Sequence, residues 1–311
     1  MHDIQKSSPY HPALQLIFLV LMAFVGAIVF TIIGFLAWLP FNSDHFSILR
    51  LTENNMQNMD ISFLRMMQIS SSLGLFIAGP IAFAYINQSK PKTYFYFDQP
   101  LKWTLFLLVI SILFASNPIF ELINEFNQKL SLPDFLNSME VWMKEKELQA
   151  AELTKKLLEM RTYNDLIINL IMIAIIPAIG EELFFRGGIQ TILKDWFKNY
   201  HVAIWVTAIL FSAIHLQFYG FFPRMLLGAL FGYLLVYGKS IWLPILGHFL
   251  NNGTAVVMAF VMQKQGKSID EIEQTSNYSI YGYAISIIIT LVLLLMFFKQ
   301  TKNNTLYSAY E

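Results

Sequence analysis

Residues 166–190 read LIINLIMIAIIPAIGEELFFRGGIQ, and this stretch decides the fold because charged residues follow directly on a long apolar run. A hydrocarbon core about 30 Å thick is crossed by about 20 residues of helix. A charged side chain near its centre costs at least about 3 kcal/mol, so such groups usually face a protein interior or a water-filled cavity. The stretch therefore predicts a membrane-spanning helix whose charged end serves a function.

The composition of the whole chain is that of a membrane protein. Of its 311 residues, 56% are hydrophobic and 14% are charged, and the mean hydropathy is +0.51. Lys plus Arg and Asp plus Glu both number 21, so no net charge attracts nucleic acid, and we exclude it as a partner. The chain has no cysteine, which excludes disulfides, thiolate metal sites and a cysteine nucleophile. The lipid bilayer is the surrounding that this composition implies.

Eight apolar segments are candidates for membrane spans. They are residues 13–39, 66–86, 102–120, 164–186, 201–216, 223–237, 241–262 and 281–298. We therefore expect an all-α, multispanning transmembrane helical bundle of about eight spans. The first segment is too long for a signal-peptide core and is followed by no small-residue cleavage site, so we expect it to be retained.

Four parts follow from this division. They are N-terminal spans at 1–130, an amphipathic connector at 131–163, a helical core at 164–262, and a last span with its tail at 263–311. In the connector, apolar side chains recur at spacings that fit one face of a helix, with most charges elsewhere. These side chains are Met139, Trp142, Leu153, Leu157 and Met160. The pattern predicts a helix lying on the bundle or on the membrane, either as a linker or as a lid or substrate-docking helix.

The short loops indicate an orientation, because Lys and Arg accumulate on the cytoplasmic side. With eight spans, the side of the two termini holds Lys6, Lys90, Lys92, Lys102, Lys194, Lys198, Lys239, Lys299 and Lys302. The opposite short loops hold Arg50, Arg65, Arg224, Lys264 and Lys267. This difference favours both termini in the cytoplasm, and we expect a multi-pass protein of a bacterial cytoplasmic membrane.

The charged end of the opening stretch separates two roles. Glu182 and Arg186 are four residues apart with the acid first, which is the orientation that favours an ion pair along a helix. Glu181 is rotated by about 100° from Glu182 on an α-helix. One carboxylate would then be neutralised by Arg186, and the other could face a cavity as a general base. The alternative is that both acids merely cap a helix end and pair with Arg186.

Two further segments place polar groups in apolar surroundings. FSAIH, residues 211–215, ends in His215, and HFLNN, residues 248–252, puts His248 and Asn252 on one helical face. Taken singly, a histidine can be a packed residue and an asparagine an interhelical hydrogen-bonding group. Ser212 precedes His215 by three residues, but no Gly-x-Ser-x-Gly turn supports a serine mechanism. Because all these groups lie in one half of the chain, we expect them to form one site.

The segments EELFFR, FSAIH and HFLNN resemble the EExxxR, FxxxH and HxxxN motifs of the CPBP family, the CAAX-type and bacteriocin-processing (Abi-type) intramembrane endopeptidases. The likeness covers about residues 160 to 260. It implies a helical membrane protein with a site in a water-accessible cavity of the bundle. It also implies hydrolysis of a peptide bond in a peptide or membrane-associated protein substrate.

The resemblance further implies roles for individual residues. Glu181 with His215 would activate a water molecule, while His248 and Asn252 would bind the oxyanion. The supporting residues would be Glu182, Arg186 and Phe211.

For cofactors we favour none, because no HExxH is present and the candidate ligands come from separate spans. A zinc ion held by Glu181, His215 and His248 is the alternative.

Two other classes of protein remain as competing predictions. Intramembrane Glu and His side chains also form proton relays, which would suit a proton-coupled transporter. Transporters often have paired halves with broken helices, and the sequence has no such symmetry. The second class is a non-catalytic membrane protein, such as an immunity protein that binds a peptide toxin without cutting it.

Overall fold

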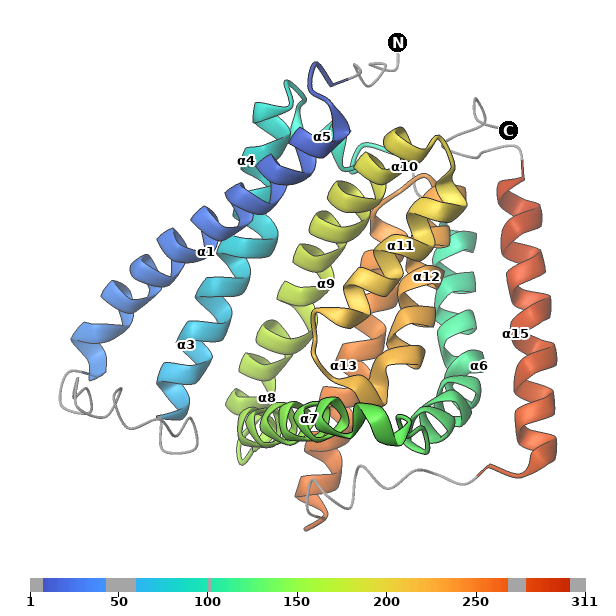
Figure 1. Ribbon diagram of the computed structural model, residues 1–311. Helices are drawn as coiled ribbons and strands as arrows, with labels where there is room; N and C mark the ends of the chain where they lie inside the picture. Colours follow the sequence, from blue (N-terminus) through green and yellow to red (C-terminus); the bar gives the residue numbers. More distant parts are fainter. Residues whose placement is uncertain (1–7, 43–59, 100–101, 268–277, 303–311) are drawn as a thin grey trace.

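The computed structural model describes residues 8–42, 60–99, 102–267 and 278–302. Within these ranges every regular element is a helix, which confirms the all-α class. The long single helices run along the bundle in Figure 1. They are α1 (Pro12–Asn42), α6 (Trp103–Gln128), α12 (Phe221–Gly238), α13 (Trp242–Lys264) and α15 (Ile280–Thr301).

Two further spans are composite and contain π-helical turns. The first consists of α3 (Ile61–Ser72), η3 (Leu73–Ala78) and α4 (Gly79–Ile86). The second consists of α8 (Tyr163–Asn169), η5 (Leu170–Ile175), α9 (Ile176–Glu181), η6 (Glu182–Gln190) and α10 (Thr191–Phe197). With these two, 7 helices in the described ranges are long and apolar enough to cross a membrane. Large apolar side chains are exposed along α1 and α15, such as Ile17 and Ile288, as expected for helices that face lipid.

The segment expected as a span at 201–216 differs from the other seven. It holds α11 (Tyr200–Ala213), which has 14 residues. At 1.5 Å per residue this helix measures about 21 Å, short of the hydrocarbon thickness of about 30 Å. The chain then turns through Leu216, which has a φ of 52°, and enters η7 (Phe218–Gly220) and α12. Irregular backbone at membrane depth is tolerated where it is buried in protein or lines a cavity.

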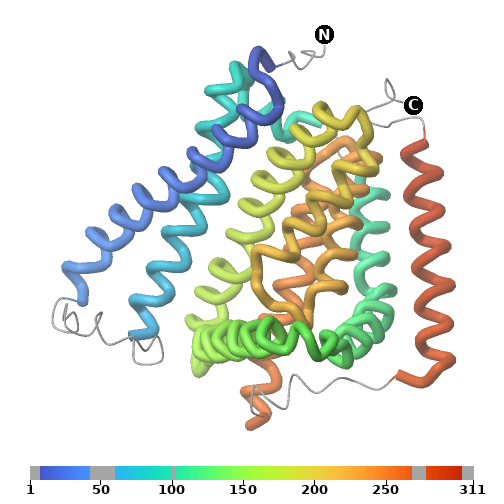
Figure 2. Tube along the Cα trace, in the orientation of Figure 1, coloured from blue at the N-terminus to red at the C-terminus, as the bar shows by residue number. Residues whose placement is uncertain are grey.

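The start of α1 and the end of α15 lie at the same end of the bundle (Figure 1). The short helix α5 (Pro91–Tyr94) lies at this end as well. The tube in Figure 2 shows the successive long helices alternating in direction between the two ends. A connector helix crosses the opposite end.

This connector helix is α7 (Asn137–Leu158), preceded by the short η4 (Asp134–Leu136). It runs across the end of the bundle rather than along it (Figure 1). Of the apolar side chains expected on its inner face, Leu157 and the following Met160 are buried, and Leu153 packs against the cluster around Leu64. Met139 is exposed, and Trp142 places its ring 5.5 Å from that of Phe218. The connector therefore lies on the bundle, beside the turn that follows α11.

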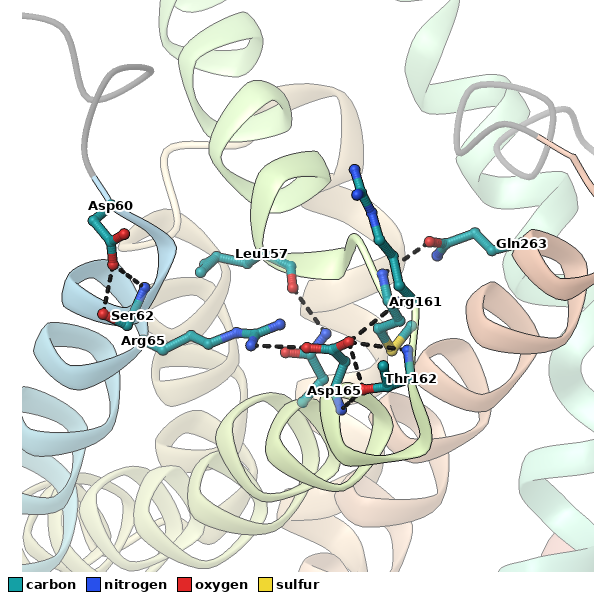
Figure 3. Close-up of polar contacts among 10 residues, drawn as sticks. Asp60, Ser62, Arg65, Leu157, Arg161, Thr162, Asp165 and Gln263 are labelled. Carbon is teal, nitrogen blue, oxygen red and sulfur yellow. Dashed lines mark hydrogen bonds and ion pairs between the residues drawn. The ribbon is translucent and has the colours of Figure 1, made fainter.

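A polar junction fastens this end of the bundle (Figure 3). Arg65 on α3 pairs with Asp165 at 3.0 Å between Nη1 and Oδ1. The other carboxylate oxygen of Asp165 accepts hydrogen bonds from the backbone N–H and hydroxyl of Thr162, which caps α8. Gln263 on α13 accepts from the backbone N–H of Met160 at 2.9 Å. The junction therefore ties α3, α8 and α13 to the end of the connector.

Candidate active site

The three polar motifs converge where α11 packs against η6 and α13 packs against α9, the helix that continues into η6. Glu181 ends α9, and Glu182 and Arg186 lie on η6. His215 follows the end of α11, and His248 lies on α13, which contacts α9 and η5. Residues up to 71 positions apart in the chain are thereby gathered into one interior.

Glu182 is the centre of a fully buried polar network. Its side chain and that of Arg186 are both 0% exposed, and Oε1 lies 2.8 Å from Nη1 of Arg186. The same oxygen lies 2.8 Å from Nδ1 of His248. Glu182 therefore forms the expected ion pair with Arg186 and in addition holds the imidazole ring of His248.

Arg186 is held in place by several groups at once. Its Nη2 donates to the backbone carbonyl of Gly228 at 3.0 Å. The guanidinium lies 4.5 Å from the ring centroid of Phe211 and 5.4 Å from that of Phe231. Aromatic faces attract a cation, which offsets part of the cost of burying it. This charge therefore belongs to the scaffold of the site.

Glu181 is placed differently from its neighbour. Its side chain retains 14% exposure, and Oε2 lies 3.9 Å from Nε2 of His248. This distance is too long for a direct hydrogen bond, and at such a separation a water molecule can bridge the two atoms. Glu181 is thus the carboxylate that lies near a polar side chain, His248, without a direct hydrogen bond to it.

His215 has a defined hydrogen-bonding state. Its Nδ1 lies 2.8 Å from the carbonyl oxygen of Phe211. Because a carbonyl only accepts, Nδ1 carries the hydrogen, and a neutral ring then has its lone pair on Nε2. The ring of Phe211 lies 5.2 Å from that of His215 and 6.0 Å from that of His248. Phe211 therefore packs near both histidines. Among the described contacts, Glu181 lies close to His248 rather than to His215.

Asn252 joins α13 to the helix that carries the acids. Its Nδ2 donates to the carbonyl of Ile173 in η5 at 3.0 Å, and its Oδ1 accepts from Asn251 at 3.0 Å. The carbonyl of Ile173 lies in a π-helical turn, a feature that is frequent at functional sites. Asn252 therefore makes an interhelical bond with one amide hydrogen and keeps the second for another acceptor.

Helix α12 contributes residues that the motifs did not indicate. Phe231 stacks on His248 with centroids 5.5 Å apart, and the carbonyls of Gly228 and Gly232 accept from Arg186 and Gln190. The sequence signal was the spacing of Gly228 and Gly232 by four residues, which matches the spacing of the two donors. No catalytic side-chain type marks these positions, so a search for such types misses them.

The candidate zinc ligands do not form a metal site in this arrangement. Nowhere in the described ranges do three or more His, Cys, Asp or Glu side chains lie close enough together to hold a metal ion. Nδ1 of His248 is engaged by Glu182, and Glu181 with Nε2 of His248 supplies two donors where catalytic zinc usually has three. In the described arrangement Glu181, His215 and His248 are therefore not gathered into one set of three ligands.

Residues 163–254 match the family model described as type II CAAX prenyl endopeptidase Rce1-like. No curated protein and no solved structure matches the chain. The matched segment begins at the first residue of α8, ends within α13 and contains all three polar motifs. The chain is thus a multi-pass membrane protein, and its residues 163–254, which hold the polar motifs, match an Rce1-like CAAX endopeptidase domain, in agreement with the predicted resemblance to the CPBP family.

Proposed function

We propose that this chain hydrolyses peptide bonds within or beside the membrane by means of a water molecule activated by Glu181. The observation that carries the proposal is the difference between the two adjacent acids. Glu182 is fully buried and bonded to Arg186 and His248, whereas Glu181 faces His248 across 3.9 Å with no pinning bond. A general base needs this freedom, because it must take and return a proton.

In the first step Glu181 takes a proton from water as the water oxygen attacks the peptide carbonyl. The new C–O bond forms, and the carbonyl π electrons move to oxygen to give a tetrahedral oxyanion. The proton then passes to the leaving nitrogen as the C–N bond breaks. We assign His215 to this transfer, because its Nε2 has a lone pair while Nδ1 is held by Phe211.

The oxyanion would be met by His248 and Asn252. Nδ1 of His248 donates to Glu182, so Nε2 offers a second hydrogen only when the ring is protonated. Glu181, Glu182, Arg186 and a protonated His248 sum to zero charge, which makes this form acceptable in a buried site. The free amide hydrogen of Asn252 supplies the other donor. Donors of this kind are each worth about 3 to 4 kcal/mol to the transition state.

We propose a glutamate-type mechanism, with a peptide or membrane-associated protein as substrate. The description of the matching family model names a CAAX prenyl endopeptidase. A peptide segment tethered to the membrane by a lipid is therefore one form of the proposed substrate class. Helix α11 ends short of the membrane thickness and is followed by an irregular turn. Irregular backbone at membrane depth occurs where it is buried in protein or lines a water-filled cavity, which is compatible with substrate access at this turn.

The test is cleavage of a peptide library by detergent-purified protein, read by mass spectrometry. Wild type should release fragments, and Glu181→Gln should lower the rate at least about 100-fold, the size usual for general-base catalysis. The control is Glu159→Gln, an exposed carboxylate at the end of α7, which should cleave like wild type. Equal rates for Glu181→Gln and wild type would refute the assignment.

A further inference from the structure

Arg224, in the first turn of α12, is a half-buried cation whose hydrogen bonds to the described residues go to neutral groups. Its Nη2 donates to the side-chain oxygen of Gln217 at 2.6 Å, and its Nη1 lies 3.4 Å from the backbone carbonyl of Gln217. The other two arginines of the described ranges that are not exposed each bond a carboxylate: Arg65 bonds Asp165 and Arg186 bonds Glu182. Arg224 is therefore the exception among these three arginines.

The position of Arg224 connects it to the catalytic groups. Gln217, to which it bonds, follows His215 by two residues. Gly228, whose carbonyl holds Arg186, follows Arg224 by one helical turn, about 6 Å along α12. The guanidinium thus lies at the edge of the proposed reaction centre, toward the end of the bundle that α7 crosses.

Glu147 on α7, the helix beside this turn, forms no ion pair with Arg224 among the described contacts. Its Oε2 accepts instead from the backbone N–H of Tyr219 at 3.3 Å. The planar guanidinium fork fits a carboxylate with two parallel hydrogen bonds, and such bonds are about twice as strong as those to a neutral amide. A carboxylate that displaces the side chain of Gln217 would therefore be bound more strongly than the partner it replaces.

We propose that Arg224 binds a carboxylate of the peptide substrate and so sets which peptide bond lies over Glu181. The carboxylate is either the C-terminus of the substrate or an acidic side chain, and the recognition chemistry is the same for both. This inference rests on the proposed function. It makes Arg224 a specificity-determining residue, and a C-terminal carboxylate as its ligand would restrict cleavage to bonds near the end of a chain.

The test uses matched synthetic peptides built on a sequence that wild type cleaves. One has a free C-terminal carboxylate, one has a C-terminal amide, and one has the amide plus an Asp inserted near the former C-terminus. Wild type should cleave the free acid with a kcat/KM at least about 10-fold above the amide, with most of the difference in KM. Recovery in the third peptide would identify an acidic side chain as a sufficient ligand.

Variants locate this preference in one residue. Arg224→Gln should bring the ratio of the two kcat/KM values close to 1, and Arg224→Lys should leave an intermediate ratio, since an ammonium keeps the charge but not the fork. Arg161→Gln removes an exposed charge away from the site and should keep the wild-type ratio. Equal cleavage of all three peptides by wild type, or an unchanged ratio in Arg224→Gln, would overturn the proposal.

Binding gives a readout that does not depend on turnover. The same fluorescent peptides are titrated into the Glu181→Gln protein with and without Arg224→Gln. The dissociation constant of the free acid should rise about 10-fold on loss of Arg224, and that of the amide should change much less. If Glu181→Gln still cleaves like wild type, the proposed function fails. If the dissociation constants of the free acid and the amide are equal, the proposed role of Arg224 is refuted while the proposed function stands.

Discussion

Two adjacent glutamates, Glu181 and Glu182, differ in burial and in hydrogen bonding. Glu182 accepts from Arg186 and His248 with one oxygen and has no exposure, so its loss leaves a buried guanidinium without its countercharge. Glu181 has some exposure and no hydrogen bond among the described contacts that would be lost. The ion pair between Glu182 and Arg186 was predicted from their spacing, and the reactive role of Glu181 stays a prediction. The bond from Glu182 to His248 was not predicted, because residues 66 positions apart have no spacing rule.

The first prediction separates the two acids by stability. Glu182→Gln should destabilise the purified protein by about 3–5 kcal/mol, because breaking a buried pair strands the charge of Arg186. Glu181→Gln should lose activity but melt within a few degrees of wild type. Thermal unfolding in detergent measures both, and indistinguishable melting curves for the two variants would contradict the division of labour.

At the level of helices, the apolar segments predicted where the spans lie. They did not predict where each helix ends or which turns are π-helical. The helix in the expected span at 201–216 ends at Ala213, where the ring of His215 donates to the carbonyl of Phe211 in place of a backbone N–H. The π-helical turns of η5 and η6 were equally invisible to a 3.6-residue period. Both departures lie at the proposed catalytic groups, and local rules are often overridden at functional sites.

Packing of the N-terminal pair of helices gives a prediction at this scale. Gly26 on α1 and Gly74 on η3 approach so closely that a Cβ on either would overlap the backbone of the other. Gly74→Ala should therefore push the helices apart and cost about 1–3 kcal/mol, as overpacking does. Gly282→Ala on α15 is the control, since its Cβ would meet only ordinary contacts from 3.4 Å outward. Equal thermal stability of the two variants would argue against this close approach.

For the molecule as a whole, composition and segment lengths predicted an all-α multispanning bundle, and this was confirmed. The arrangement of the spans could not be predicted, because it depends on contacts between distant residues. Asn252 to Ile173 and Arg65 to Asp165 are two examples, 79 and 100 positions apart. The orientation in the membrane stays a prediction: both termini on the cytoplasmic side, with α7 on the other side.

The absence of native cysteine allows this orientation to be tested directly. Single cysteines are placed at the exposed positions Lys92 and Lys302, at the end that holds both α5 and the close of α15, and at Glu145 on α7. In intact bacterial cells a membrane-impermeant maleimide should label only Glu145→Cys, and all three after lysis. The reverse pattern would place the termini outside, and labelling of one terminal-end position alone would contradict the arrangement of the helices.

The central claim is that Glu181, without a metal ion, activates the attacking water. It is tested most directly by the kcat/KM for one cleaved peptide, measured on wild type, on Glu181→Gln, and on wild type dialysed against a chelator with and without added zinc. The account predicts a loss of at least about 100-fold in the variant and full activity in the chelated enzyme, unchanged by zinc. Activity that disappears on chelation and returns with zinc would contradict it, and would make Glu181 a ligand rather than the base.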